Sequence, residues 1–353
     1  MKAAVLSSYR KFEIKEVPDP VAGPGEVIVR IKFASICGSD MHIFNGDFHP
    51  RTPVPFIPGH EMGGIVELVG DGVEDYFPGD KVAIDPIIWC GHCPACSEGH
   101  FPACTSLKLI GIDLDGGFCE KVSVPSSMLF KADPSIPDEQ VALAEIYAIG
   151  FHANKRAGTR EGQSLAIWGA GRVGQVILQA ARTKTGGKIF MVDPVEKRLA
   201  IAEKYYPGIV TVNPLKVNPV QFIRDHTGGR GVDIAFEAVG HADEIPGVHN
   251  PARCCIQSIK GGGTVCMLGL GDDPFPVLFK EMIWKEAKIV SSRVSHGEFA
   301  EVLANLAKKT LHPEALISAV FPDSAIQEAF VLLENDKSNY LKILLDFSGH
   351  HDS

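Results

Sequence analysis

Four cysteines lie close together in one short segment of the 353-residue chain, at positions Cys90, Cys93, Cys96 and Cys104. Their thiolates are spaced closely enough to surround one metal ion. Four thiolates without an open position are typical of a tetrahedral structural zinc site. Iron–sulfur clusters also take four thiolates, and the spacing alone does not exclude them. A metal lobe over about residues 88–106 is the strongest local signal in the sequence.

A glycine-rich turn is the second chemical signal. Gly169, Gly171 and Gly174 follow an apolar segment and open a helical one. The first glycine permits a tight turn, the second lets the backbone approach a pyrophosphate, and the third packs helix against strand. Asp193 ends the next apolar segment, 19 residues after Gly174. Its carboxylate would bind the adenosine ribose and repel the additional phosphate of NADP, so the pattern predicts an NAD site.

Other residues extend this predicted cofactor site. Arg172 and Val173 lie between the second and third glycines, where their backbone N–H groups can face phosphate. Arg198 follows in the next helical segment, where it either reaches the ribose or faces solvent. Leu268 and Gly269, at the end of the apolar segment 262–270, are further predicted cofactor contacts.

A third set of chemical groups is dispersed along the chain. Cys37 follows a predicted strand, and His60 and Glu61 stand at the start of another. Cysteine, histidine and carboxylate together form a zinc-competent set. Each residue alone is more commonly an ordinary core or surface residue, and only resemblance to a known family gives these positions a role.

The elements that must position these groups change in style along the chain. Up to about residue 147, short β segments broken by Gly and Pro predict an antiparallel, partly barrel-like domain. Over 148–292, apolar strands alternate with helices, which predicts a parallel sheet buried on both faces. The tail 293–353 returns to the first style, with a helix near 297–309 and a strand at 340–347.

Composition limits the partners. The net charge of −9 argues against nucleic acid or an anionic membrane, because both select basic patches. No stretch approaches the roughly 20 apolar residues that span a bilayer. The nine cysteines are an odd number, and the N-terminus turns charged too early for an export signal. We therefore expect metal binding instead of a disulfide framework, and a cytoplasmic protein.

Together these segments resemble the zinc-containing medium-chain dehydrogenases, in particular the sorbitol, threonine and sugar-acid dehydrogenase branch. The resemblance covers essentially the whole chain. Its motifs are Gly59-His60-Glu61, the cysteine lobe, GGFCEKVSVP, the glycine turn and TGGRGVDIAFEAVG. It implies an α/β fold in which a Rossmann doubly wound parallel sheet (148–292) is inserted into a GroES-like β-barrel catalytic domain (1–147 and 293–353).

Carried over residue by residue, the resemblance implies a catalytic zinc ion bound by Cys37, His60 and Glu145. Glu61 would be a further ligand that exchanges with water or with Glu145. Asp40 would accept a hydrogen bond from the far ring nitrogen of His60 and fix its tautomer. With the cysteine lobe, two zinc ions per chain are expected.

The same resemblance implies a proton relay through Ser39 and a cofactor ribose hydroxyl to His42, whose ordinary pKa of about 6.5 suits release to solvent. The alternative for His42 is a plain surface histidine. Relatives commonly have Glu-Pro-Leu where this chain reads Glu145-Ile146-Tyr147. Loss of the proline predicts a less constrained loop there, with the Tyr147 ring near the pocket.

The predicted reaction is the NAD-linked oxidation of a secondary alcohol on a polyol or sugar acid. Arg293 resembles a position that faces the pocket in sugar-alcohol and sugar-acid members, where it would clamp a carboxylate, or else pair with Glu145 or the cofactor. Predicted substrate contacts are Ser39, Phe118, Glu145 and Arg293. An L-threonine 3-dehydrogenase is the nearest alternative, and a non-catalytic NAD-binding sensor a distant one. Relatives are usually tetramers or dimers, so we expect a homo-oligomer.

Overall fold

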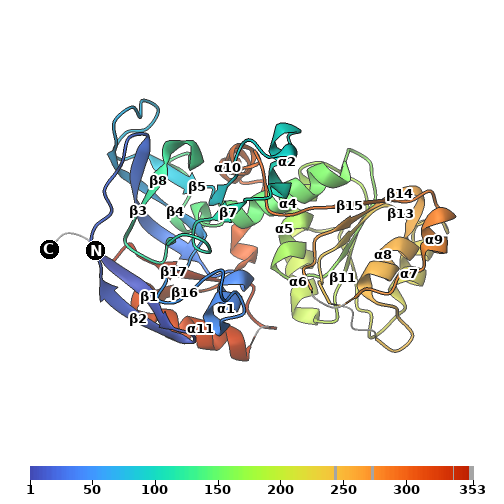
Figure 1. Ribbon diagram of the computed structural model, residues 1–353. Helices are drawn as coiled ribbons and strands as arrows, with labels where there is room; N and C mark the ends of the chain where they lie inside the picture. Colours follow the sequence, from blue (N-terminus) through green and yellow to red (C-terminus); the bar gives the residue numbers. More distant parts are fainter. Residues whose placement is uncertain (242–244, 272–273, 337, 350–353) are drawn as a thin grey trace. The chain divides into compact units, whose positions relative to one another are not determined.

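The computed structural model describes residues 1–241, 245–271, 274–336 and 338–349 (Figure 1). The chain divides into two compact units. The first consists of Met1–Ile146 together with His296–Ser353, and the second of Tyr147–Ser295. The second unit is therefore inserted, in sequence, between the two parts of the first.

The second unit is built on a six-stranded sheet in the order β12-β11-β10-β13-β14-β15, in which every pair of neighbours is parallel. The order runs outwards in both directions from β10 and β13, so the connections switch sides between these two strands. In such sheets ligands bind at the carboxyl ends of the strands beside the switch point. The strands are β10 (Leu165–Trp168), β11 (Ile189–Val192), β12 (Val210–Val212), β13 (Val232–Glu237), β14 (Ile259–Met267) and β15 (Lys288–Ser291).

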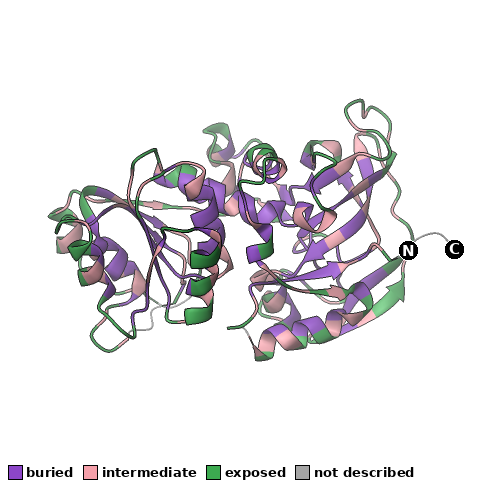
Figure 2. Ribbon diagram, turned by 180° about the vertical axis from the view of Figure 1, so that it is seen from behind, coloured by how far each residue is buried: buried purple, intermediate pink, exposed green. Residues whose placement is uncertain are grey.

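Apolar side chains of these strands are buried on both faces. All four residues of β10 and of β11 are buried, and two separate hydrophobic clusters cover the two sides of the sheet. Figure 2 shows the buried strands and the exposed outer turns of the helices. The helices are α4 (Ala144–Ala157), which begins in the first unit, α5 (Arg172–Arg182), α6 (Glu196–Tyr205), α7 (Pro219–Asp225), α8 (Pro251–Ser258) and α9 (Phe279–Ile283).

The first unit contains a seven-stranded, mainly antiparallel sheet in the order β16-β17-β3-β4-β5-β9, with β8 also paired to β3. Register shifts along the β3–β4 pair bend the sheet. Strand β17 pairs with β3, so the C-terminal tail completes the sheet begun near the N-terminus. The strands are β3 (Glu26–Ser35), β4 (Glu61–Val69), β5 (Lys81–Ile84), β8 (Lys121–Pro125), β9 (Leu129–Lys131), β16 (Ile317–Pro322) and β17 (Lys342–Asp346).

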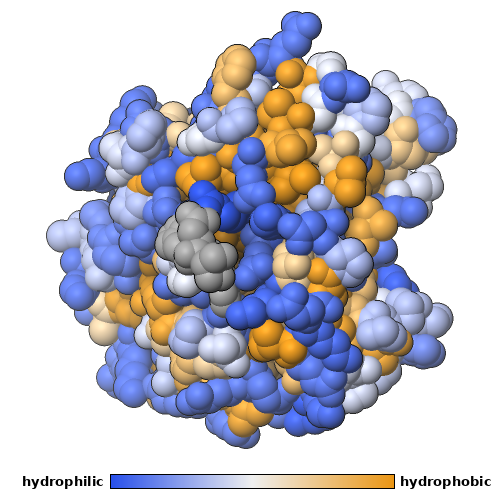
Figure 3. All heavy atoms as spheres, turned by 90° about the vertical axis from the view of Figure 1, so that its left-hand side faces the viewer, coloured by the Kyte–Doolittle hydropathy of each residue, from blue (hydrophilic) through white to orange (hydrophobic). Residues whose placement is uncertain are grey.

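Smaller elements surround this sheet. Strands β1 (Lys2–Ser8) and β2 (Lys11–Glu16) form a hairpin, and β6 (Ile87–Ile88) pairs with β7 (Lys108–Leu109). The helices are α1 (Gly38–Asn45), α2 (Pro94–Ser97), α3 (Asp138–Val141), α10 (Phe299–Ala307) and α11 (Ile326–Asn335). Among the described residues, no helix is long and apolar enough to cross a bilayer. Figure 3 shows one face of the molecule, where hydrophilic side chains surround several apolar patches.

Candidate active site and metal centres

The pairing of β3 with β4 brings the first candidate centre together. Ser35 at the end of β3 lies opposite Glu61 at the start of β4. Cys37, which follows β3 and precedes α1, therefore lies beside His60, which precedes β4. Ligand atoms of Cys37, His60 and Glu61 all lie within 4.8 Å of one another. Three residues separated in sequence thus form one compact, metal-competent group.

Helix α1 orients the ring of His60. Asp40 is fully buried, and its Oδ1 lies 3.4 Å from His60 Nδ1. Its other oxygen, Oδ2, accepts a hydrogen bond from the Cys37 backbone N–H at 2.8 Å. Ser39 Oγ lies 3.3 Å from His60 Nε2, on the other side of the ring. Asp40 therefore faces Nδ1, and Nε2 is the ring nitrogen on the Ser39 side.

Charges at this centre favour a thiolate. Burial and the Glu61 carboxylate raise the pKa of Cys37, but Lys342 and His60 outweigh them, so the pKa is lowered from its ordinary value. Burial lowers the pKa of His60, and the opposing charges of Asp40 and Cys37 raise it well above its ordinary value. A thiolate is the form of cysteine that binds metal.

Glu61 is held by a lysine from the distant C-terminal strand. Both of its carboxylate oxygens accept hydrogen bonds from Lys342 Nζ, and both side chains are fully buried. Burial raises the pKa of Glu61, but Lys342 and His60 lower it below the ordinary value. Sequence reasoning missed Lys342, whose only local signal is a cation at the start of the apolar strand segment KILLD.

Glu145 supplies a second carboxylate. It lies in the first turn of α4 and is 3% exposed. Burial first, and then the nearby Glu61 charge, raise the pKa of Glu145 to about 8. Its Oε2 is buried without a hydrogen-bond partner within the described part of the chain. Such an atom fits a metal ligand, because an unpaired buried carboxylate is otherwise costly.

The expectation of a loose loop at this position is wrong. Residues 145–147 lie in the first turn of α4, which runs unbroken from Ala144 to Ala157. The Tyr147 ring is fully buried within the second unit, and its hydroxyl donates to Gln179 Oε1 of α5 at 2.9 Å. Tyr147 therefore packs inside the second unit, and its side chain has no exposed surface that could line a pocket.

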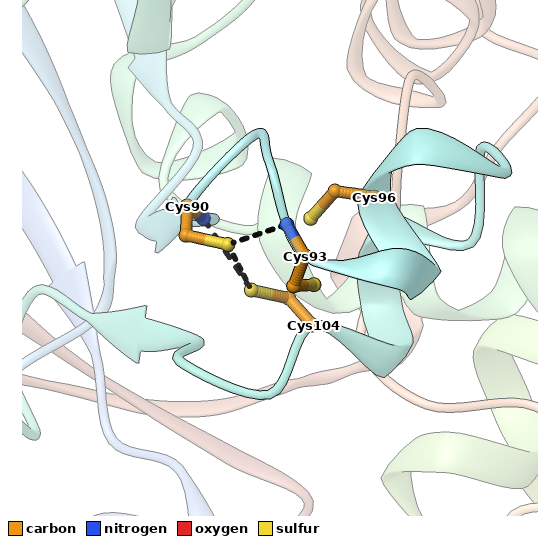
Figure 4. Close-up of side chains that lie close together, drawn as sticks. All are labelled: Cys90, Cys93, Cys96 and Cys104. Atoms are coloured by element: carbon orange, nitrogen blue, oxygen red, sulfur yellow. Dashed lines mark hydrogen bonds between the residues drawn. The ribbon is translucent and has the colours of Figure 1, made fainter.

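The four-cysteine lobe is compact, as the spacing predicts. Ligand atoms of Cys90, Cys93, Cys96 and Cys104 lie within 4.8 Å of one another. Figure 4 shows the four side chains around a common space, with α2 supplying Cys96. Backbone N–H groups point at the sulfurs. The Cys93 N–H donates to Cys90 Sγ, and the Cys90 N–H donates to Cys104 Sγ, each at 3.3 Å. A hydrogen bond from the Thr105 backbone is the main cause that lowers the pKa of Cys93 to about 5.

The glycine turn lies at the carboxyl end of β10, beside the switch point of the parallel sheet. A Cβ on Gly174 would lie 1.8 Å from the Gly169 carbonyl oxygen, so only glycine permits this close packing of turn and helix. Gly171 precedes the first residue of α5, so free N–H groups open towards the turn. This arrangement suits a pyrophosphate.

Asp193 directly follows β11 beside this turn and is 4% exposed. Its Oδ2 accepts from the Ala170 N–H at 2.7 Å and its Oδ1 from the Val195 N–H at 2.8 Å. Arg198 Nη1 lies 3.9 Å from Oδ2. The carboxylate is therefore fixed by the turn itself, and each oxygen keeps a further lone pair for a ligand hydroxyl.

Glu237 is a residue of this edge that sequence reasoning missed. Its buried carboxylate accepts hydrogen bonds from the backbone N–H groups of Val239, Gly240 and Gly269. It thereby joins the loop after β13 to the loop after β14, where Leu268 and Gly269 lie. A buried acid at the end of an apolar strand is the signal that could have indicated it.

Both parts of the chain match known protein families. Residues 23–138 match the family model described as "Alcohol dehydrogenase GroES-like domain", and residues 173–308 match "Zinc-binding dehydrogenase". The "Starvation-sensing protein RspB" of Escherichia coli K12 is 30% identical over 99% of this chain and 100% of its own. The chain belongs to the zinc-binding alcohol dehydrogenase family.

Two other similar proteins are informative. A "2-dehydro-3-deoxy-L-galactonate 5-dehydrogenase" of Pseudoalteromonas atlantica is 28% identical over 95% of this chain and 96% of its own. A crystal structure of "short chain alcohol dehydrogenase (rspB)" from E. coli CFT073, complexed with NADH, has a TM-score of 0.89 and 28% identity, covering 98% of this chain and 99% of that one. The expected GroES-like and Rossmann-type fold is thus confirmed, and the chain is an oxidoreductase of this family.

Two predicted substrate contacts of the dehydrogenase have different surroundings. Phe118 is fully buried against Phe330, and a Cβ on Gly59 would lie 2.5 Å from its ring. It presents no surface to a ligand, so the expectation that it contacts substrate is not supported and we set it aside. Arg293 is exposed, just after β15 in the second unit.

Proposed function

We propose that this dehydrogenase oxidises a secondary alcohol of a polyol or sugar acid to the ketone, with NAD as the hydride acceptor. The compact group of Cys37, His60 and Glu61, with the buried Glu145 close enough to feel their charges and one of its oxygens unpaired, carries this proposal. These residue types fit a catalytic zinc ion, which keeps three protein ligands and one open position. When bound there, zinc would supply the Lewis acidity that makes an alcohol proton easier to lose.

Charge counting supports Glu145, and not Glu61, as the resting carboxylate ligand. Glu61 lies nearer Cys37 and His60, but Lys342 already matches its charge. The thiolate of Cys37 and the carboxylate of Glu145 together offset the double charge of the ion. The open position would then accept a neutral alcohol. Glu61 is proposed as the exchanging ligand.

The residues of α1 would move the proton. Asp40 Oδ1, 3.4 Å from His60 Nδ1, would hold the tautomer of His60, so that the ring presents its other nitrogen to the metal. Ser39 Oγ, 3.3 Å from His60 Nε2, lies where it can accept a proton from a bound alcohol and pass it on. His42, whose side chain is 59% exposed, would release the proton to solvent.

Asp193 supports the choice of NAD over NADP. Its oxygens are fixed by the glycine turn and retain lone pairs for ribose hydroxyls. A 2′-phosphate placed there would lie beside the buried negative charge of Asp193. We expect this repulsion to exceed the attraction between the phosphate and the nearby Arg198. We propose that Gly169, Gly171, Arg172, Val173, Gly174, Leu268 and Gly269 form the remaining cofactor contacts.

A substrate panel tests the proposal. Polyols, sugar acids and L-threonine would be offered with NAD and with NADP, and formation of the reduced nicotinamide followed by absorbance. Turnover of a sugar acid or polyol with NAD supports the proposal. Preference for L-threonine would establish the alternative activity, and binding of NAD without turnover of any alcohol would favour a sensor. Arg293→Ala would show whether this residue clamps a substrate carboxylate, by raising KM for sugar acids but not for neutral polyols.

Three further properties belong to the proposal. Four clustered thiols and the Cys37 centre should hold two zinc ions per chain. We also propose that the protein is cytoplasmic and that it forms a homo-oligomer. The homo-oligomer is supported by large apolar side chains exposed in and directly after α9: Phe279 is 70%, Ile283 72% and Trp284 73% exposed. Light scattering would give the mass in solution, and a monomer would contradict this part.

A further inference from the structure

Helix α1 ends at Asn45 (Figure 1), and just beyond its end a carboxylate lies against the ring of His42. Asp47 Oδ2 lies 2.8 Å from His42 Nδ1. An ionised carboxylate only accepts hydrogen bonds, so the proton of this contact belongs to Nδ1. In the neutral ring, the other nitrogen, Nε2, is then the one with a free lone pair.

Backbone geometry fixes this contact. Gly46, just after α1, has a φ of +86°, which folds the chain back over the last turn. Gly46 N–H donates to the Ile43 carbonyl at 3.0 Å, and Asp47 N–H donates to the His42 carbonyl at 2.9 Å. This pair of bonds is the Schellman arrangement, in which the residue after the glycine is tied to the helix. Asp47 is thus bound to His42 through its backbone as well as its side chain.

A stack of side chains holds the ring in the remaining direction. The Phe48 ring lies parallel to His42, with 5.7 Å between centroids and 10° between planes. The Arg51 guanidinium lies over the Phe48 ring, 6.0 Å from its centroid. Its Nε and Nη2 donate to the two carboxylate oxygens of Asp113 at 2.8 Å each. The stack Asp113, Arg51, Phe48 and His42 therefore leaves the ring little freedom to turn away from Asp47.

We propose that Asp47 is a positioning residue for proton release: it fixes His42 with the proton on Nδ1, so that Nε2 faces away from Asp47 as the proton acceptor. The inference rests on the proposed relay function of His42. Once Nε2 has accepted a proton, the ring still donates from Nδ1 to the Asp47 carboxylate. Deprotonation at Nε2 then returns the ring to the same tautomer for the next turnover.

Nitrogen-15 NMR of the histidine rings tests the positioning directly and needs no turnover. The chain has 13 histidines, so the His42 signals would be assigned by their loss in His42→Gln. At about pH 8, where an ordinary histidine is neutral, His42 should carry its proton on Nδ1. In Asp47→Ala this preference should be lost, and in Asp47→Glu it should be retained.

Kinetics test the consequence. Asp47→Ala should lower kcat about 2- to 10-fold, the range expected for loss of one hydrogen bond, with zinc content and KM for NAD unchanged. Added imidazole should restore part of the loss. The matched control is Glu314→Ala, because Glu314 Oε1 lies 3.0 Å from Nδ1 of another exposed histidine, His312. That variant should change the His312 tautomer and leave kcat unchanged.

The outcomes separate this inference from the relay. An unchanged His42 tautomer in Asp47→Ala overturns the inference. A changed tautomer with wild-type kcat also overturns it, provided that His42→Ala lowers kcat. If His42→Ala itself keeps wild-type kcat, the relay is refuted, and the tautomer alone then decides whether Asp47 positions the ring.

Discussion

Replacement of Lys342 by methionine should be one of the most damaging single changes outside the metal ligands. Lys342 Nζ donates to both oxygens of Glu61 and lies 3.4 Å from the Ile36 carbonyl, and both charged side chains are fully buried. Lys342→Met fills a similar volume but leaves Glu61 as a buried charge without its partner. The perturbation is therefore electrostatic and not a loss of packing.

The magnitude can be worked in two ways. Breaking a buried ion pair by removing one partner typically costs about 3–5 kcal/mol. Glu61 can instead take up a proton. At about pH 7 the solution is roughly 2.7 units above the ordinary pKa of a glutamate, about 4.3, and each unit costs about 1.4 kcal/mol. The product is about 4 kcal/mol, so both routes predict a loss of about 3–5 kcal/mol in the free energy of unfolding.

Urea unfolding of the zinc-loaded protein measures this loss, with zinc content determined for each variant. Lys342→Arg is the matched control and should stay within about 1 kcal/mol of wild type, because it keeps the charge. The double variant Glu61→Gln with Lys342→Met should be more stable than Lys342→Met alone, since no buried charge is left unpaired. A loss below about 1 kcal/mol in Lys342→Met would refute the reasoning.

Three further predictions concern other parts of the chain. Cys96→Ser should lower the unfolding temperature while the folded protein keeps most of its kcat, because a closed metal site contributes folding free energy. A variant with the wild-type unfolding temperature and no turnover would contradict a structural role for this site. Asp193→Ser should raise the use of NADP relative to NAD, and a wild-type preference for NADP would refute the reading. Burial, and then the Glu298 charge, raise the pKa of Asp85 to about 7. Between about pH 4 and pH 7 the folded chain therefore binds more protons than the unfolded one, and stability falls as pH rises. Asp85→Asn should remove up to about 4 kcal/mol of this fall, and identical pH profiles of urea midpoints for wild type and variant would contradict it.

Local patterns in the sequence predicted some of this molecule well. The glycine turn and the cysteine lobe are each complete within a short segment, so their spacing carries their geometry. Cys37 and His60 are 23 residues apart, and only the register of β3 against β4 brings them together. Their role came from resemblance to a family and not from periodicity.

Long-range charge contacts could not be predicted in this way. Lys342 and Glu61 are separated by 281 positions and meet only because β17 returns to β3. Glu145 was expected on a loop, but it lies in the first turn of α4. The residue at which a helix begins depends on its tertiary packing as well as on the local sequence. The contact of Asp47 with His42 spans five positions but depends on the left-handed turn at Gly46.

The zinc content of His60→Ala, measured together with its turnover, decides whether the Cys37 centre holds a catalytic zinc ion. Elemental analysis of active wild-type protein should find two zinc ions per chain. His60→Ala should keep the ion of the cysteine lobe and lose the other, and its reduction of NAD with the best polyol or sugar acid should be abolished and not restored by added zinc. A His60→Ala protein that holds one ion and turns over at the wild-type rate would contradict the account.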